Sequence, residues 1–370
     1  MKSEFYIGLM SGTSLDGVDV ALTRIEDSHH VNGSGFYVLH THFIPFPITL
    51  REQLLTLHHS SDNELKKTAL AANELAQLYA KAVNELLSTH HISPDNISAI
   101  GCHGQTIRHR PELGFTLQIG NAALLAELTN LTVVSDFRSR DIAAGGQGAP
   151  LVPSFHQAVF ADKNIHRAVI NIGGIANLTD LPIDGIVKGF DTGPGNMLMD
   201  AWAMQHLAVA YDESGNWATT GKVITTLLTE LLAHSYFSKP PPKSTGRDLF
   251  NLTWLKQYLK HEYSPNDVQR TLLEFTAVSI SDAVSKHCKN VKEIYLCGGG
   301  ALNNALIKCM TQLLPFIKIA RTDDLGISVN CVEAAAFAWL ARQAVHQEKI
   351  NLAEVTGAKG ARILGAIYAN

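Results

Sequence analysis

The chain has 370 residues, of which 46% are hydrophobic and 17% charged, so it can bury a large core and is long enough for two domains. Its net charge of -4 lacks the basic footprint of a nucleic-acid-binding protein, and we expect no nucleic-acid partner. No stretch approaches the roughly 20 apolar residues of a membrane span, and the start "MKSEFYIGLMSG" does not resemble a signal peptide, so we expect no membrane association.

Apolar segments and helical periodicity predict alternating strands and helices in the first half of the chain. A strand over 5–10 and a second strand from Val18 would form a hairpin around the polar turn "SGTSLDG". Apolar residues recur at helical spacing over 63–87, which predicts a long amphipathic helix. Further along we predict strands at 97–102, 116–120 and 131–137, with a helix at 121–128.

The second half of the chain follows a similar plan. Residues 166–181 predict a strand, a turn at Gly173 and Gly174, and another strand, which resembles the opening hairpin with its Gly12. The following segments predict a strand, tight loop and helix over 185–202, a Pro-rich surface loop over 238–250, helices over 268–288, after Ala301 and over 332–345, and a strand over 293–300. This alternation indicates an α/β fold, and the two glycine-turned hairpins indicate an internal duplication.

The cysteines indicate the cellular compartment. None forms a Cys-x-x-Cys pair, so their spacing suggests neither a disulfide framework nor a zinc site. Reduced thiols are typical of a cytoplasmic protein, which is the predicted localisation. The sequence contains five of them: Cys102, Cys288, Cys297, Cys309 and Cys331.

Three glycine turns, each beside an apolar strand, point to a nucleotide site. Glycine lets the backbone approach a ligand closely, and successive N–H groups in such turns bind anions. Each turn alone is explained as a simple change of chain direction, but three together favour phosphate binding. The pattern is neither a Walker loop, because no Gly-Lys-Ser/Thr follows, nor a dinucleotide fingerprint, because no G-x-G-x-x-G opens a helix.

The duplicated hairpins and the late Gly-Gly-Gly turn resemble the actin-like, hexokinase and Hsp70 ATPase superfamily. The resemblance implies two actin-like ATPase domains of duplicated architecture, each a mixed sheet flanked by helices, with ATP in an interdomain cleft. We place the first domain at 1–130 plus 345–370 and the second at 131–344. Six blocks in order look like one family within it, anhydro-N-acetylmuramic acid kinase: "GLMSGTSLDGVDVAL", "GCHGQT", "SDFRSRDIAAGGQGAPLVP", "NIGGIANLT", "GFDTGPGN" and "CGGGALNN".

This family resemblance implies a reaction and its ligands. The family uses ATP and water to open the 1,6-anhydro ring of anhydro-N-acetylmuramic acid and to phosphorylate O6, during recycling of cell-wall fragments. The implied cofactors are ATP and Mg²⁺, the implied partner is the small sugar substrate, and a homodimer is a candidate assembly that the sequence does not specify. The residues expected at the nucleotide are Gly12, Thr13, Ser14, Leu15, Asp16, Gly17, Val18, Asp19, Gly173, Gly174, Gly298, Gly299 and Gly300.

The base that activates water is expected to be a carboxylate. Asp191 follows the predicted strand over 185–190, and the resemblance assigns the base to it. Read without the resemblance, Asp191 is equally well explained as a helix cap or turn residue. Asp16 and Asp19 are the alternatives; the superfamily pattern places Asp16 near Mg²⁺ through water, and Asp19 is otherwise a solvated strand residue.

Three further residues are candidates for binding the sugar. An arginine can hold the lactyl carboxylate of muramic acid, and we favour Arg138 over Arg140 because their alternation places them on opposite faces of an extended segment. The alternative for Arg138 is a surface ion pair with Asp136 or Asp141. Glu333 either contacts the sugar or favours the start of its helix. His103 either contacts the sugar or is a structural histidine.

Two other functions remain open at this point. One is an ordinary hexose or amino-sugar kinase of the same superfamily, which needs no water. The other is an ATP-switched binding protein, but the motifs begin at Gly8 and continue past Gly300, which leaves little chain for a peptide-binding or DNA-binding domain.

Overall fold

The computed structural model describes residues 3–12, 14–26 and 35–370. The chain divides into two compact units, Met1–Val159 with Cys331–Asn370 (unit 1) and Phe160–Asn330 (unit 2). These boundaries differ from the predicted ones, which lay after residue 130 and before residue 345. The reason is that β7 (Val133–Ser135) pairs with a strand of unit 1, and α11 (Val332–Val345) packs on the sheet of unit 1.

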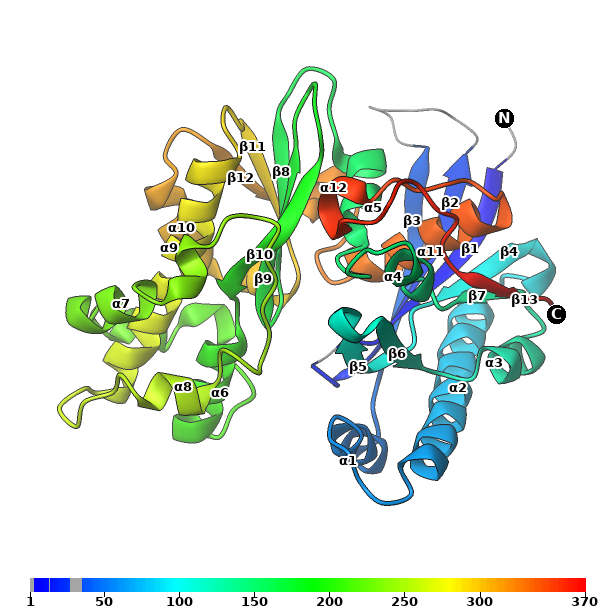
Figure 1. Ribbon diagram of the computed structural model, residues 1–370, viewed down its shortest axis with the longest axis horizontal. Coiled ribbons are helices and arrows are strands. Elements are labelled where there is room, and N and C mark those ends of the chain that lie inside the picture. The colour runs from blue at the N-terminus through cyan, green and yellow to red at the C-terminus, as the bar shows by residue number, and fades with distance from the viewer. Residues whose placement is uncertain (1–2, 13, 27–34) are drawn as a thin grey trace. The chain divides into compact units, whose positions relative to one another are not determined.

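Unit 1 is built on a six-stranded mixed sheet with the order β13-β7-β4-β1-β2-β3 (Figure 1). β1 is antiparallel to β2, which confirms the predicted opening hairpin, and β2 is antiparallel to β3. On its other side β1 is parallel to β4, and β4 is parallel to β7. The strands are β1 (Ser3–Met10), β2 (Gly17–Glu26), β3 (Phe36–Pro45), β4 (Ile97–Cys102), β7 and β13 (Ala366–Tyr368).

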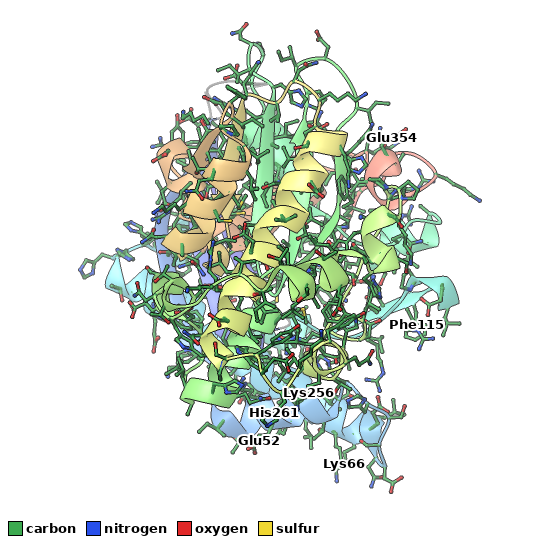
Figure 2. All side chains as sticks on the ribbon, turned by 90° about the vertical axis from the view of Figure 1, so that its left-hand side faces the viewer. Glu52, Lys66, Phe115, Lys256, His261 and Glu354 are labelled. Atoms are coloured by element: carbon green, nitrogen blue, oxygen red, sulfur yellow. The ribbon has the colours of Figure 1, made fainter. Side chains whose placement is uncertain are left out.

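Helix α2 (Glu64–Thr89) covers one face of this sheet and confirms the amphipathic helix predicted over 63–87. Its buried side, which includes Leu75 and Tyr79, shares a core with Ile7 of β1. Its opposite side is exposed, and the side chain of Lys66 extends outwards from it (Figure 2). Amphipathic periodicity was a sufficient signal here because one helix side is dry and the other is wet.

Helix α11 packs on the same sheet so closely that two strand positions need glycine. A Cβ on Gly8 of β1 would lie 1.7 Å from Ala334 O, and a Cβ on Gly101 of β4 would lie 1.9 Å from Phe337 O. The run of alanines in "VEAAAFAWLA" likewise keeps this helix slim. Gly8 and Gly101, which stand in two of the motif blocks, therefore have a packing role.

The remaining elements of the first unit surround the sheet. The strand predicted at 131–137 is shorter than expected, while those at 97–102 and 116–120 and the helix at 121–128 are confirmed. The elements are α1 (Ile48–Thr56), β5 (Gln105–Arg110), β6 (Phe115–Ile119), α3 (Ala122–Thr129), α4 (Ser139–Ala143), α5 (Val152–Phe160) and α12 (Ala353–Thr356).

Unit 2 contains a five-stranded sheet with the order β10-β9-β8-β11-β12. The predicted hairpin of 166–181 is confirmed as β8 and β9, and the strand predicted over 293–300 ends at Cys297. Its elements are β8 (Arg167–Ile172), β9 (Ile175–Leu181), β10 (Lys188–Pro194), α6 (Met197–Leu207), α7 (Thr225–Leu232), the 3-10 helix η5 (Ser235–Ser238), α8 (Leu252–Lys256), α9 (Pro265–His287), β11 (Glu293–Cys297), the 3-10 helix η6 (Gly299–Leu302), α10 (Asn304–Leu313) and β12 (Lys318–Arg321).

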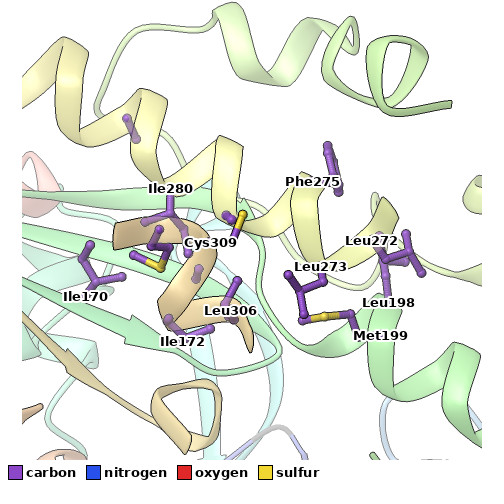
Figure 3. Close-up of a cluster of buried hydrophobic side chains, with 14 of the residues drawn as sticks. Ile170, Ile172, Leu198, Met199, Leu272, Leu273, Phe275, Ile280, Leu306 and Cys309 are labelled. Atoms are coloured by element: carbon purple, nitrogen blue, oxygen red, sulfur yellow. The ribbon is translucent and has the colours of Figure 1, made fainter. Parts of the chain in front are cut away.

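The long helix α9 organises the core of unit 2. Figure 3 shows Leu273 and Ile280 of α9 with Ile172 of β8, Leu306 of α10 and Met199 of α6 in one buried cluster. These side chains are buried almost completely, so the sheet and three helices form one hydrophobic core.

The two sheets share one plan, which confirms the predicted duplication. In each, three sequential antiparallel strands are followed by two strands added in parallel next to the first, giving β3-β2-β1-β4-β7 and β10-β9-β8-β11-β12. The α/β class, with two mixed sheets flanked by helices, is likewise confirmed. Within the described ranges, no helix combines the length and apolar character needed to cross a membrane.

Candidate functional site

The opening turn between β1 and β2 is fixed to the body of unit 1. Ser11 is buried, its hydroxyl lies 2.7 Å from the Tyr79 hydroxyl, and it donates to Gly104 O at 3.1 Å. Gly12 O accepts from Leu15 N and from the Gln105 side chain. Leu15 has a φ of 56°, in the region that branched or bulky residues avoid, so the turn is held in a set shape. Thr13, expected at the nucleotide, lies outside the described residues.

Two carboxylates follow this turn and differ in environment. Asp16 is exposed, and its Oδ1 accepts from Ser14 Oγ at 2.8 Å and from Gly17 N at 3.1 Å. Asp19 is partly buried in β2, and burial, with smaller contributions from the charges of Asp16 and Glu333, raises its pKa to about 7. The alternative of an ordinary solvated strand residue therefore does not fit Asp19. Val18, between them, points its side chain into the core.

We expect Asp19→Asn to stabilise unit 1 above neutral pH. The raised pKa means that the folded state binds a proton more tightly than the unfolded state, so ionisation costs stability progressively from about pH 4 to about pH 7. Asparagine removes this cost, on the order of 2–4 kcal/mol at pH 8 and much less at pH 4. Thermal melting at both pH values measures the gain, and equal gains at both would contradict the electrostatic explanation.

In unit 1, the buried His103 pairs with the partly buried Arg138. Arg138 donates from Nε and Nη2 to His103 Nε2 at 3.1 and 2.9 Å, and from Nη1 to Gly148 O at 2.8 Å. His103 Nδ1 lies 2.7 Å from Gly104 O and donates to it. Burial, followed by the charge of Arg138, lowers the pKa of His103 to about 3, so its ring is neutral. Both ring nitrogens are engaged, which favours a structural histidine over a direct contact with the sugar.

The local structure around the two arginines differs from the extended segment that we expected. Arg138 is the N-cap of α4, and Arg140 is an exposed residue inside this short helix. Asp141 does not take up the guanidinium, because its carboxylate accepts from Gly148 N at 2.7 Å and from Thr356 Oγ1 at 2.8 Å. Arg138 therefore remains the better candidate for the lactyl carboxylate.

Glu333 lies in the first turn of α11, near the same group of charges. Burial raises its pKa, and the positive charge of Arg138 acts in the opposite direction. Burial lowers the pKa of Arg138 to about 10, although the negative charges of Glu333 and Asp141 act in the opposite direction. His103, Arg138, Glu333 and Asp19 thus belong to one electrostatically coupled group in unit 1.

In unit 2, Asp191 lies within β10, whereas the sequence predicts a position just after the strand. The strand continues to Pro194, and its pairing with β9 shifts between Asp191 and Gly193, so Thr192 is an extra residue. The predicted strand stopped too early because "DTGPG" has the composition of a turn. Such a bulge bends a strand and redirects a side chain. The Thr192 hydroxyl donates to Ala176 O, which holds the bulge.

The loop 239–251 supports Asp191, although its composition predicted only a surface loop. Thr245 N donates to Asp191 Oδ2 at 3.0 Å, and Lys243 O accepts from Asp191 N at 3.1 Å. Tyr236, just before the loop, donates from its hydroxyl to Asp191 O at 2.7 Å. Burial raises the pKa of Asp191 to about 6, while the Thr245 N–H and the charge of Lys243 act in the opposite direction. No local sequence signal connects this loop with Asp191, because the contact spans more than fifty residues.

The glycine turns of unit 2 lie next to one another. The turn between β8 and β9 accepts hydrogen bonds through its carbonyls, from Gly195 N and Met197 N to Gly174 O and from Asn196 N to Gly173 O. The Asn196 side chain donates to Ile172 O. It also lies beside η6, because a Cβ on Gly300 would be 2.9 Å from Asn196 Oδ1.

The glycines that we expect at the nucleotide fall into two groups, according to the space that a Cβ would have at each. A Cβ on Gly17 would lie 2.3 Å from Ile44 O, one on Gly298 2.2 Å from Asn171 Oδ1, and one on Gly300 2.3 Å from Ile172 Cγ2. Gly298 also has a φ of 77°. The protein itself explains these three glycines. The second group has no Cβ neighbour closer than 3.6 Å and no left-handed φ, so the protein does not explain its lack of side chains: Gly12, Gly173, Gly174 and Gly299.

The described ranges contain no group of three or more His, Cys, Asp or Glu side chains placed to hold a metal ion. Carboxylate oxygens of the kind that Asp16 and Asp19 carry are nevertheless the donors that Mg²⁺ prefers, and Mg²⁺ usually keeps several waters. These two residues therefore fit a magnesium ion held largely through water and phosphate.

Solved structures similar to this chain share little sequence with it. The activator of 2-hydroxyisocaproyl-CoA dehydratase from Clostridium difficile, with bound ADPNP, is 12% identical, with 93% of this chain and 96% of that chain covered and a TM-score of 0.46. A glucokinase of the ROK family from Streptomyces griseus, in complex with glucose and AMPPNP, is 12% identical, with coverage of 92% and 99% and a TM-score of 0.42. Both scores are below 0.5, so they carry no conclusion.

Sequence comparison is more informative. A family model described as anhydro-N-acetylmuramic acid kinase matches residues 4–370. Relatives with this name are 54% identical over 370 residues in Nitrosospira multiformis, with 100% of both chains covered, and 56% identical over 370 residues in Thiobacillus denitrificans, with 99% of this chain and 98% of the relative covered. One from Pseudomonas syringae is 50% identical over 366 residues, with coverage of 98% and 99%. The chain therefore belongs to the anhydro-N-acetylmuramic acid kinase family.

Proposed function

We propose that Asp191 is the general base of this kinase and activates water for attack on the anhydro sugar. The observation that carries the proposal is the setting of Asp191: a half-buried carboxylate on a bulge, held by Thr245 N and Lys243 O, with a pKa of about 6. A base of this pKa is ionised at neutral pH and still binds a proton well, which suits general base catalysis. Asp16, which is engaged by Ser14, is the weaker alternative.

The reaction then follows from one proton transfer. Asp191 takes a proton from water as the water oxygen bonds to C1 of the sugar. The bond between C1 and O6 breaks, and O6 gains the electron pair. O6 attacks the γ-phosphorus of ATP, and ADP leaves. The products are N-acetylmuramic acid 6-phosphate, ADP and the proton that Asp191 accepted and later releases.

We further propose that glycine turns bind the triphosphate. Gly12 of unit 1 and Gly173, Gly174 and Gly299 of unit 2 have space where a side chain would be, which is the space that phosphate oxygens need to reach backbone N–H groups. Magnesium, bound with ATP near Asp16 and Asp19, would neutralise phosphate charge. Asp19 would then be held ionised.

For the sugar, we propose that Arg138 binds the lactyl carboxylate and that His103 positions the guanidinium of Arg138. The neutral ring of His103 accepts two N–H groups of Arg138 and orients the guanidinium, which still has other N–H groups for a carboxylate. Glu333 would interact with sugar hydroxyls near this pair.

We expect Arg138→Lys to raise KM for the sugar about tenfold or more while leaving ATP affinity unchanged. Lysine keeps the charge but loses the bidentate geometry and cannot satisfy His103 and Gly148 O together. Steady-state kinetics with each substrate varied measures this split. Arg140→Lys is the matched control, because Arg140 is exposed, and an equal effect of both variants would contradict the assignment.

We expect the sugar turnover to fall on the acidic side of about pH 6. The general base must be ionised in the free enzyme, so kcat/KM decreases about tenfold per pH unit once Asp191 is protonated. A profile of kcat/KM from pH 4.5 to 8 measures this decrease on the acidic side. ATP binding measured in the same buffers separates it from titration of Asp19, and a flat profile through pH 5 would argue against Asp191 as the base.

The proposed reaction is distinguished from ordinary sugar phosphorylation by the fate of water. With ¹⁸O-labelled water, the product carries the label at C1 if hydrolysis accompanies phosphorylation. An unlabelled phosphorylated product would favour the alternative of an ordinary amino-sugar or hexose kinase. We also propose that the protein works in the cytoplasm, where ATP and sugar fragments meet, and as a homodimer, which light scattering of the purified protein tests.

A further inference from the structure

A second feature of unit 2 lies directly beside the loop that supports Asp191. It is a cavity of about 330 Å³, close to the lower end of the size range for small-molecule sites. Four segments form it: the bulge of β10, the segment from the end of α7 through η5, the loop 239–251, and the last turns of α9. The lining comprises Thr192, Leu232, Ala233, His234, Phe237, Ser238, Lys243, Ser279, Asp282, Ala283, Lys286 and His287.

The charged side chains of this cavity are mostly cationic. Lys243 and Lys286 contribute ammonium groups and His287 an imidazole, whereas Asp282 is the acidic residue among the described residues of the lining. Lys286 Nζ lies 3.7 Å from Asp282 Oδ2, and both side chains are about 60% exposed. Such a surface ion pair contributes little, so Lys286 can leave it for a stronger partner at small cost.

Lys243 is held at the cavity with donors to spare. Its Nζ donates to Tyr236 O at 3.2 Å and lies 4.6 Å from the centre of the Tyr236 ring. An ammonium has three N–H groups, so this single backbone acceptor does not exhaust it. The hydroxyls of Thr192 and Ser279 already donate to backbone oxygens. The donors left for a ligand are therefore mainly the charged ones.

The positive charges at the cavity are only partly balanced by the acidic groups near them. Burial and then the charge of Lys286 lower the pKa of Lys243, and Lys239 acts in the same direction, although Asp191 opposes them. Burial and then the charges of Lys243, Lys286 and Lys188 lower the pKa of His287. Two ammonium groups that disfavour each other's charge favour an anion between them, and the imidazole of His287 can donate an N–H group to it.

We propose that this cavity binds a small phosphate-bearing molecule through Lys243, Lys286 and His287, and that its occupancy alters turnover at Asp191. The coupling would run through Lys243, whose carbonyl accepts from Asp191 N, and through Tyr236, whose hydroxyl donates to Asp191 O. An anion on Lys243 also removes positive charge from the neighbourhood of Asp191. This second half rests on the proposed role of Asp191, whereas the binding itself does not.

Calorimetric titration with inorganic phosphate tests the binding, with a saturating non-hydrolysable ATP analogue present to fill any nucleotide site. We expect wild type to bind phosphate and Lys286→Gln to bind it about tenfold more weakly. Lys289→Gln is the matched control, because Lys289 is exposed just beyond the same helix and is not in the lining. Absent binding in wild type, or equal affinity in wild type and Lys286→Gln, would overturn the proposal.

Steady-state kinetics tests the coupling separately. Phosphate should lower kcat in wild type and in Lys289→Gln, without being relieved by more ATP, and should have a weaker effect on Lys286→Gln. If phosphate binds but kcat is unchanged, the proposed coupling to Asp191 would be overturned, whereas the proposed binding site would stand. Since calorimetry needs no turnover, a protein that binds phosphate but is inactive towards the sugar would refute the proposed function and not the cavity.

Discussion

Asp191→Asn should reduce the rate of sugar phosphorylation by about 10²–10⁴-fold. The amide cannot accept a proton from water, yet its oxygen can still accept from Thr245 N, and the backbone bonds to Lys243 and Tyr236 do not involve the side chain. The fold and ATP affinity should therefore be preserved. Initial rates of ADP release in the presence of the sugar measure the loss.

Two controls make this test specific. Asp184→Asn changes an exposed carboxylate just before β10 and should retain wild-type kcat. At pH 8 the melting temperature should be equal to or above that of wild type, because burial raises the pKa of Asp191 and asparagine removes the cost of its ionisation in the folded state. If Asp191→Asn keeps more than about half of the wild-type kcat, another group activates the water, and Asp19 becomes the next candidate.

The parts of the fold that could be predicted are those with a local signal. Helix α2 has one wet side and one dry side, so its periodicity was sufficient. The glycine-turned hairpins revealed the duplication, because both units repeat the same three-strand start. The domain boundaries were misplaced because they depend on which sheet a segment joins. Neither β7 nor α11 carries a sequence mark of its sheet, and their places follow from long-range pairing and packing.

The same distinction applies to the candidate site. Asp191 was found from its motif, but its bulge and its partner loop were not, because "DTGPG" looks like a turn and Thr245 lies far along the chain. The partnership of His103 with Arg138 was also missed, since only the fold brings residues 35 positions apart together. A charged or aromatic residue in or just before a Pro-rich loop is a weak signal, although Lys243 and Tyr236 both belong to the surroundings of Asp191.

The glycines give the sharpest contrast between a structural and a ligand-related role, and Gly12 is the best position to test it. A Cβ at Gly12 would have Ser14 Oγ as its nearest neighbour, at 3.7 Å, and the turn is held from both sides by Ser11 and Leu15. The described residues leave room for a Cβ here, so we expect the protein to tolerate a side chain. A phosphate that approaches the backbone would not.

We expect Gly12→Val to weaken ATP binding by about ten- to a hundredfold while the melting temperature stays near that of wild type. The loss corresponds to about one charge-assisted hydrogen bond from the backbone, at about 1.5–3 kcal/mol. Gly300→Ala is the matched opposite: its Cβ would lie 2.3 Å from Ile172 Cγ2 in a closed core, so it should destabilise the fold by about 1–3 kcal/mol. Calorimetric titration with an ATP analogue and thermal melting of both variants separate the two effects. A folded Gly12→Val protein with wild-type ATP affinity would mean that the opening turn is only a chain reversal, and that the phosphates are held by the glycine turns of unit 2 alone.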